Sequence, residues 1–304
     1  MMKKNKQKWL EARKTYLGGT DISAVIGVNP YRTALDVYLE KTSEDVMPQQ
    51  DNEAMYWGRT LEDIVLKEYS KRTGVNVIPP MGTHHDIKHK FLACNIDGWV
   101  ENGVILECKT AGARANDQWG EEGTDEIPEA YLCQVAWYCA ITGAHRADIA
   151  VLIGGQDFRI YTYYANKDFQ DKLIQAGVDF WQSHILKLCP PPATNTQDLI
   201  KVYGKSNEQS IEASPEILEK ARNLKDMVVA KKSLEEDIKN IQFQIQDFMR
   251  EYDVLTDNEG NTIVTWKNRK SSDKLDAKTL RKNFPEIYVQ HLTESKSSRT
   301  FLIK

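Results

Sequence analysis

Residues 95–110 read NIDGWVENGVILECKT, and this stretch decides the fold because it combines a chain reversal with a row of charges. Two runs rich in Ile, Trp, Val and Leu flank Asn102-Gly103, a pair that is typical of β-hairpin turns. Asp97, Glu107 and Lys109 interrupt these apolar runs. A hairpin is therefore predicted, and the position of its turn determines whether the three charged side chains share one face.

The register of this hairpin has two alternatives. A two-residue turn pairs Asp97 with Cys108, so that Asp97 faces away from Glu107, because side chains alternate along a strand. A three-residue loop with Gly103 in a left-handed conformation pairs Asp97 with Glu107 and puts both on the face of Lys109. We favour the second register, because it alone gathers the charges. The residues expected on the opposite, buried face are Val104, Leu106 and Cys108.

The predicted face carries two carboxylates on adjacent strands, which repel each other unless a positive charge lies between them. Mg²⁺ commonly binds one or two protein carboxylates together with water and substrate phosphate. Lys109, two residues beyond Glu107, would then orient or deprotonate an attacking water. The spacing Asp-x9-Glu-x-Lys fits the PD-(D/E)XK nuclease pattern, with Ile96 in place of the proline. This combination indicates a site for metal-assisted hydrolysis of a phosphodiester.

The first 200 residues alternate between helical and strand patterns. A predicted helix at 129–142 separates the second strand of the hairpin (104–110) from the next strand (147–153), and such a crossover implies an α/β fold with a central sheet flanked by helices. Further helices are expected at 6–16, from about 20, and at 33–41, 52–73 and 167–187. Strands are expected at 76–79, 91–100, 104–110, 147–153 and 157–164.

A proline-rich segment, CPPPATNTQDL at 189–199, precedes a change in composition. We therefore divide the chain into a domain at 1–200 and an extension at 201–304. The extension is predicted to contain a long amphipathic helix at about 214–252, a hairpin at 258–270 and a final strand at 297–304. The apolar residues of the long helix recur every three or four positions, as in a coiled coil. This helix either packs on its own domain, which we favour, or meets another subunit or a partner.

Three further groups of polar residues could belong to a functional site or could have an ordinary structural role. Glu62 lies on a helix with an apolar stripe and would supply a third acid, unless it is a solvated helix charge. Gln134 and Tyr138 lie four residues apart on an otherwise apolar helix, so each needs a buried partner. A glycine-rich N-terminal segment carries guanidinium and hydroxyl groups that suit an anion site. They belong to Arg13, Thr20, Ser23 and Arg32.

The composition is that of a soluble globular protein, with 41% hydrophobic and 28% charged residues and a net charge of −4. No apolar run approaches the roughly 18 residues that span a bilayer, and the N-terminus lacks the apolar core of a signal peptide. We therefore expect a cytoplasmic protein with no membrane partner. The five cysteines contain no CxxC pair, so free thiols are expected instead of disulfides, zinc or an iron–sulfur cluster.

Four blocks of the sequence, in this order, resemble the YqaJ-type viral recombinase family, which is related to bacteriophage lambda exonuclease. The blocks are WLEARKTYLGGTDISAVIGVNPYRTALDVYLEKT (9–42), YWGRTLEDIVLKEY (56–69), FLACNIDGWVENGVILECKT (91–110) and AYLCQVAWYCAITG (130–143). The resemblance covers roughly residues 8–190. It implies a restriction-endonuclease-like core that uses Mg²⁺, or Mn²⁺ in its place, and no organic cofactor. It also implies 5′→3′ digestion of double-stranded DNA ends, which leaves a 3′ single strand.

The same resemblance implies roles for individual residues and for partners. The 3′ strand would pass to a single-strand annealing protein, in a bacterial host cell with a phage or prophage. A homo-oligomer, a trimer by analogy, is expected. The implied metal ligands are Asp97, Glu107, Glu62 and the Cys108 carbonyl. The implied catalytic and site-lining residues are Lys109, Gln134 and Tyr138, and the implied ligands of the 5′-phosphate or DNA are Arg13, Thr20, Ser23 and Arg32.

Two departures from the family pattern and two alternative functions remain. Thr20 stands where a serine is usual, which keeps the hydroxyl group. The last hundred residues have no counterpart in the lambda enzyme, so the trimer is in doubt. The alternatives are another nuclease of this superfamily, cutting internally or from the 3′ end, and a non-catalytic module that binds DNA ends. Retention of Asp97, Glu107 and Lys109 favours an enzyme.

Overall fold

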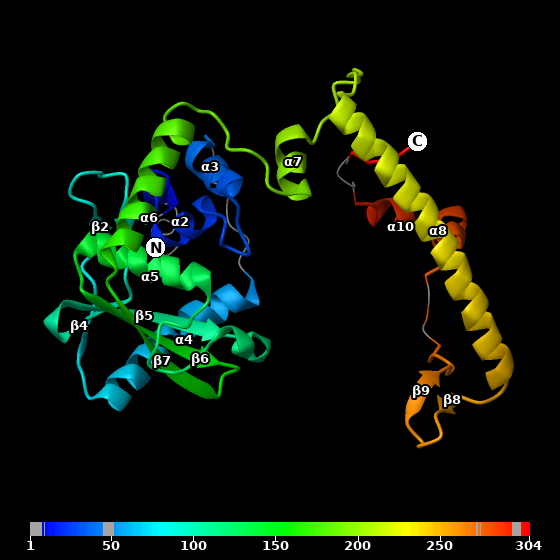
Figure 1. The fold of residues 1–304 in the computed structure, drawn as a ribbon, viewed down its shortest axis with the longest axis horizontal. Helices are drawn as coiled ribbons and strands as arrows, with labels where there is room; N and C mark the ends of the chain where they lie inside the picture. Colours follow the sequence, from blue (N-terminus) through cyan, green and yellow to red (C-terminus); the bar gives the residue numbers. More distant parts are fainter. Residues whose placement is uncertain (1–7, 9, 45–51, 272, 274, 294–298) are drawn as a thin grey trace. The chain divides into compact units, whose positions relative to one another are not determined.

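The computed structural model describes residues 8, 10–44, 52–271, 273, 275–293 and 299–304. The chain forms two compact units, Met1–Leu199 and Ile200–Lys304. The first unit contains the α/β fold, and the second contains a long helix with a small hairpin (Figure 1).

A five-stranded sheet forms the centre of the first unit, in the order β1-β4-β5-β6-β7. Its strands are β1 (Val77–Ile78), β4 (Gly98–Val100), β5 (Val104–Ala111), β6 (Arg146–Ile153) and β7 (Asp157–Tyr164). Strands β5 and β6 pair in parallel, and the other neighbours pair antiparallel. A parallel pair requires a crossover, and helix α5 (Glu129–Thr142) supplies it. The sheet is therefore mixed, as expected.

Helices cover both faces of this sheet. They are α2 (Gly19–Val25), α3 (Ala34–Thr42), α4 (Glu53–Thr73), α5 and α6 (Lys167–Phe180), with a π-helical turn at Trp181–Ile185 after α6. Helix α4 packs Val65 and Tyr69 against Leu106 on one face of the sheet. On the other face, side chains of α2, α5 and α6 pack with Ile105. Because both faces are covered, β5 is buried from Val104 to Cys108, and the predicted α/β fold with flanking helices is confirmed.

The hairpin has the register in which the charges share a face. Gly98 pairs with Leu106 and Val100 with Val104, so the connection is a three-residue loop, and this prediction is confirmed. Gly103 has φ 72°, as expected, and Asn102 is also left-handed, with φ 62°. Asparagine tolerates this conformation better than most side chains.

The predicted single strand at 91–100 is wrong. Residues Ala93–Cys94 form β3, which pairs with β2 (His84–His85) in a separate two-stranded sheet. Residues 95–97 belong to no strand, and the main sheet resumes at Gly98. The carboxylate of Asp97 accepts a hydrogen bond from the main-chain N–H of Cys108. In a longer β4, a main-chain carbonyl of that strand would accept from this N–H group instead.

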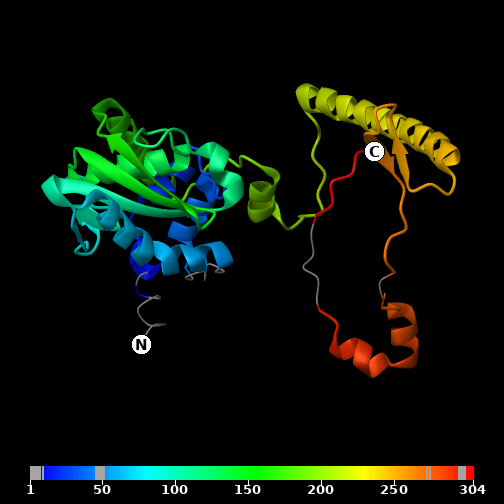
Figure 2. The same ribbon diagram turned by 90° about the horizontal axis from the view of Figure 1, so that it is seen from below.

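The second unit is built around helix α8 (Pro215–Met249), which Figure 2 shows as one continuous helix. Ser214 caps its N-terminus, and Met249 is the one buried residue among its 35. A hairpin of β8 (Val254–Thr256) and β9 (Thr262–Thr265) follows, starting earlier than the predicted 258–270. Two short helices come next, α9 (Ala277–Asn283) and α10 (Pro285–Gln290).

The predicted final strand at 297–304 is wrong for residues 299–304, which form no strand; residues 297 and 298 lie outside the described residues. The apolar side chains of Phe301 and Leu302 are exposed, so they lack the packing against a neighbouring strand that stabilises a β-strand. All five cysteines are free, as predicted, and Cys189 alone is exposed. Within the described residues, no helix is long and apolar enough to cross a membrane.

Candidate active site

The three charged residues of the hairpin meet where β4 begins and β5 passes beyond it. Asp97 Oδ2 accepts a hydrogen bond from the N–H of Cys108 at 2.7 Å. Two residues apart on β5, Glu107 and Lys109 form an ion pair through Oε1 and Nζ. The ammonium of Lys109 also lies 4.9 Å from the centre of the Tyr131 ring, a cation–π distance. The structure therefore brings Asp97, Glu107 and Lys109 together.

The main chain of Cys108 adds a second polar group on the same side. In a strand, the N–H and C=O of one residue point to the same neighbouring strand. Cys108 directs its N–H toward Asp97, so its carbonyl also points to the side that β4 has left, since β4 pairs only as far as Gly98 opposite Leu106. This carbonyl is therefore available beside the two carboxylates.

Helix α5 supplies the buried amide that the sequence predicted to need a partner. Gln134 Nε2 donates to Glu107 Oε1 at 2.8 Å and to the Tyr138 hydroxyl at 2.6 Å. Both side chains are almost fully buried, at 4% and 5% exposure. The amide thus fixes one oxygen of Glu107 and ties it to Tyr138.

Burial and mutual electrostatic interactions shift the pKa values of Asp97, Glu107 and Lys109. Burial raises the pKa of Glu107 to about 8, and the charge of Asp97 adds to the rise while Lys109 opposes it. Burial also raises the pKa of Asp97. For Lys109, burial acts to lower the pKa, but the carboxylates of Glu107 and Asp97 outweigh it and the pKa is raised. The Lys109 ammonium is therefore the charge that offsets the two carboxyl groups here.

The donor set fits Mg²⁺ better than a metal that needs an all-protein cage. Within the described parts of the chain, no three His, Cys, Asp or Glu side chains converge closely enough to hold a metal by themselves. Mg²⁺ keeps several waters and uses one or two carboxylates. Glu107 Oε2 is buried and has no hydrogen-bond partner, which is costly unless a ligand takes it up. Asp97, Glu107 and the Cys108 carbonyl are the groups that would hold the ion.

Glu62 lies nearby on α4 but is not part of a three-carboxylate cluster. The pKa of Glu62 is raised, mainly by burial and then by the charges of Asp97 and Asp63, while Lys109 acts to lower it. Its carboxyl group therefore lies within electrostatic range of Asp97 and Lys109.

Three of the four residues predicted to bind an anion lie together, around a residue that the sequence did not reveal. Arg13 donates to the Thr20 hydroxyl at 3.4 Å and to Asp21 at 3.3 Å. Arg32 donates to the same oxygen of Asp21 at 2.9 Å. Ser23 is buried instead, and its hydroxyl donates to the Thr20 carbonyl and accepts from Asn29. Arg13, Thr20 and Arg32 thus lie together, while Ser23 holds the adjoining turn.

Asp21 and Lys41 are the ion pair that sequence reasoning missed. Both side chains are fully buried, and Lys41 Nζ lies 2.8 Å from Asp21 Oδ2. Burial acts to raise the pKa of Asp21, but Lys41, Arg13 and Arg32 together lower it well below its usual range. Asp21 also accepts from the N–H of Gly18 as the N3 residue of a capping box. That capping position was the one sequence signal for Asp21.

Helices α2 and α5 connect the anion site to the carboxylates. A Cβ atom built on Gly19 would lie 2.5 Å from the Tyr138 ring and 3.0 Å from the Gln134 side chain. A short path therefore runs from Gly19 through Tyr138 and Gln134 to Glu107.

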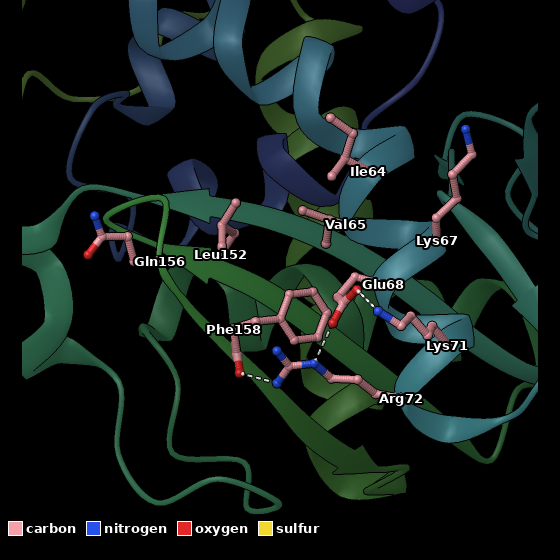
Figure 3. A pocket seen from close by; sticks show the side chains of 9 residues that line it. All are labelled: Ile64, Val65, Lys67, Glu68, Lys71, Arg72, Leu152, Gln156 and Phe158. Carbon is pink, nitrogen blue, oxygen red and sulfur yellow. Dashed lines mark hydrogen bonds and ion pairs between the residues drawn. The ribbon is translucent and has the colours of Figure 1, made fainter.

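A separate cavity of about 410 Å³, drawn in Figure 3, lies between α4 and the ends of β6 and β7 that their turn joins. It is lined by Ile64, Val65, Lys67, Glu68, Lys71, Arg72, Leu152, Gln156 and Phe158. The Arg72 guanidinium lies 4.5 Å from the centre of the Phe158 ring and pairs with Glu68 at 2.8 Å. None of the predicted site residues lines this cavity, so it is not the candidate active site.

Comparison with known proteins gives matches over most of the chain. The YqaJ-like viral recombinase domain family matches residues 8–145. The uncharacterized protein YqaJ of Bacillus subtilis (strain 168) is 30% identical over 297 residues, covering 93% of this chain and 90% of that protein. The uncharacterized protein R354 of Acanthamoeba polyphaga mimivirus is 28% identical over 153 residues, covering 47% of this chain and 28% of that protein. The Bacillus subtilis similarity extends into both units.

Solved structures include similar chains at low sequence identity. The alkaline exonuclease LHK-Exo from Laribacter hongkongensis has a TM-score of 0.49 at 14% identity, covering 60% of this chain and 94% of that one. A phage related exonuclease from Haemophilus somnus 129PT has a TM-score of 0.43 at 13% identity, covering 57% of this chain and 96% of that one.

Proposed function

This chain belongs to the YqaJ-like viral recombinase family, and we propose that it is a Mg²⁺-dependent exonuclease acting on the ends of double-stranded DNA. It would digest one strand from 5′ to 3′ and leave a 3′ single strand for an annealing protein in a bacterial host cell. The observation that carries the proposal is the buried Oε2 of Glu107, which accepts no hydrogen bond from a protein N–H or O–H group and belongs to a carboxyl group that interacts with both Asp97 and Lys109. Family membership supplies the substrate class.

Different residues of the site would bind the metal, orient its ligands and position the attacking water. Asp97, Glu107 and the Cys108 carbonyl would hold Mg²⁺, and Glu62 would complete the acidic cluster. When bound, Mg²⁺ neutralises charge on the scissile phosphate and lowers the pKa of water. Gln134 holds Oε1 of Glu107, so that Oε2 is directed to the ligand. Lys109, on the same face, would position the attacking water next to the phosphate.

The polarity of digestion would come from the anion site. Arg13, Arg32 and Thr20 present two guanidinium groups and a hydroxyl, which suit a terminal phosphate. Gly19 and Tyr138 join this group to the carboxylate pair through α2 and α5. A 5′-phosphate at the first site would thereby place the next phosphodiester along the strand at the second.

Digestion of an end-labelled duplex tests the proposal. Linear DNA labelled at one 5′ end should release its label early in Mg²⁺ or Mn²⁺, whereas a 3′ label on the same strand should be released late. A closed circle should stay intact. Early loss of the 3′ label would favour a 3′-directed enzyme, and nicking of the circle would favour an endonuclease. Absence of cleavage in both metals would favour a module that only binds DNA ends.

We further propose that α8 joins copies of this chain into a homo-oligomer. Its sequence supports a 3.5-residue repeat over five heptads, enough for a coiled coil. The two seam positions of each heptad are occupied by Ile217, Lys220, Leu224, Met227, Lys231, Leu234, Ile238, Ile241, Ile245 and Phe248. Ile238 and Ile241 are 46% and 56% exposed. A second copy of the same helix would bury this seam, with Lys231 restricting its register.

A further inference from the structure

Glu40, on α3, lies across the same two guanidinium groups that we assign to the 5′-phosphate. Its Oε2 is 2.7 Å from Nη2 of Arg32, and its Oε1 is 4.0 Å from Nε of Arg13. Oε1 is also 3.4 Å from Nζ of Lys41. On their other side, both guanidinium groups contact Asp21. Each arginine is therefore bracketed by two carboxylates.

The two carboxylates differ in how easily they can be replaced. The Asp21 side chain is 0% exposed, and Lys41 and the Gly18 N–H also hold it. The Glu40 side chain is 38% exposed, and it sits at the open side of arginines that are themselves 20% and 21% exposed. An incoming anion can therefore take the place of Glu40 but not that of Asp21.

The charges fit such an exchange. Arg13, Arg32 and Lys41 carry three positive charges against the two negative charges of Asp21 and Glu40. When Glu40 swings away, the excess of positive over negative charge among these five side chains rises from one to two. A terminal phosphate carries −1.5 to −2 charges at neutral pH, as phosphorylated side chains do, roughly matching this excess. A phosphodiester within a strand carries one charge, the same as Glu40, and gains little by replacing it.

We propose that Glu40 is a built-in competitor for the 5′-phosphate site: its carboxylate occupies the Arg13–Arg32 pair until a terminal phosphate displaces it. This inference rests on the proposed recognition of 5′-phosphorylated ends and assigns Glu40 a role in its specificity. By weakening the site for every phosphate, Glu40 leaves monoanionic phosphodiesters unbound while dianionic termini still bind. Glu40 would thus increase specificity by disfavouring phosphodiesters, the wrong ligand, instead of by adding a contact to the terminal phosphate.

The substitution Glu40→Gln tests this role, since it keeps the shape of the side chain and removes its charge. Binding is measured by fluorescence anisotropy in Ca²⁺, with duplexes that differ only in a 5′-phosphate or a 5′-hydroxyl. We expect about fivefold tighter binding of the 5′-phosphate duplex, the scale of one partly exposed ion pair. The 5′-hydroxyl duplex should gain at least as much, because its internal phosphodiesters no longer compete with the Glu40 charge, so the preference for the 5′-phosphate should not rise. Inorganic phosphate, used as a competitor, should also bind the variant more tightly.

A matched control separates this effect from the general loss of an ion pair. Glu68 on α4 pairs with Arg72 at 2.8 Å, and its side chain is 33% exposed, close to the exposure of Glu40. Glu68→Gln should therefore leave phosphate binding unchanged. If thermal unfolding shows that Glu40→Gln is destabilised, Glu40→Ala provides the same loss of charge.

The outcomes distinguish the inference from the function on which it rests. Unchanged or weaker binding of the 5′-phosphate duplex by both Glu40 variants would overturn the inference, because Glu40 would then merely support the arginines. A wild-type protein with no preference for the 5′-phosphate would instead overturn the proposed end recognition. In that case, tighter binding of inorganic phosphate by Glu40→Gln would still support the competitor role of Glu40.

Discussion

Gly19 on α2 rests directly on the ring of Tyr138 on α5: a Cβ atom at position 19 would lie 2.5 Å from Cε1 of the tyrosine. Alanine is favoured over glycine in helices by about 1 kcal/mol, so helix propensity alone predicts that Gly19→Ala stabilises the protein. Overpacking costs about 1–3 kcal/mol and also displaces Tyr138 and Gln134. We expect Gly19→Ala to lower both the melting temperature and the nuclease activity.

The neighbouring glycine provides the control for this prediction. A Cβ atom on Gly18 would approach no closer than 3.7 Å to Asp21 and 3.9 Å to Tyr16, which are ordinary contacts. Gly18→Ala should therefore keep near wild-type stability and activity. A stabilised Gly19→Ala variant would contradict the tight contact between α2 and α5.

Glu107→Gln should make the metal-free protein more stable at neutral pH while it abolishes hydrolysis. With its pKa raised to about 8, Glu107 keeps its proton in the folded state at pH values where the unfolded chain has lost it. Stability therefore falls as the pH rises from about 4.5 to about 8. The substitution removes this loss, a gain of about 1–3 kcal/mol at pH 7.

Urea unfolding in EDTA at several pH values measures this gain. The wild-type and Glu107→Gln proteins should have similar free energies of unfolding near pH 4.5 and should diverge as the pH rises. A constant difference between them across this range would show that Glu107 does not change its protonation on folding.

Asp97→Asn should reduce digestion of linear duplex DNA by at least about 100-fold. The amide oxygen can still accept the N–H of Cys108, so the hairpin should stay folded, but the negative charge beside Glu107 is lost. DNA binding, measured by anisotropy, should persist. Asp63→Asn, which changes an exposed carboxylate next to Glu62, is the control and should stay active. Full activity of Asp97→Asn would disprove the assignment of the site.

Arg13→Ala should reduce the preference for 5′-phosphorylated over 5′-hydroxyl ends by about tenfold, because one of the two guanidinium groups is lost. Initial digestion rates on the two substrates give this ratio, and the 5′-hydroxyl substrate serves as the internal control. An unchanged ratio would remove Arg13 from end recognition.

Ile238→Glu should prevent self-association through α8, since it puts a charge at the middle of the proposed seam. Light scattering during size-exclusion chromatography gives the mass of each species. Phe243→Glu changes an apolar residue outside the seam that is exposed as well, 68% against 46% for Ile238, and should leave the mass unchanged. If the two variants have the same mass, the seam is not the contact between copies.

The sequence predicted those features that depend on local chemistry. The three-residue loop followed from Gly103, and the need of Gln134 for a buried partner followed from its apolar helix; the partner is Glu107. The Asp21–Lys41 pair could not be predicted, because twenty residues separate its members and neither position has a signal of its own beyond the capping box. The late start of β4, at Gly98, could not be predicted either, because the Asp97 side chain accepts the hydrogen bond that a longer strand would have accepted.

The parallel pairing of β5 with β6 has a consequence for the newly made chain. Asp97, Glu107 and Lys109 leave the ribosome together, but Gln134 follows on α5, and β6 is complete only at Ile153. Until those later residues dock, β5 lacks its neighbour and Glu107 lacks the amide that orients it. A partly synthesised chain thus carries all three charges before the site that orients them is assembled.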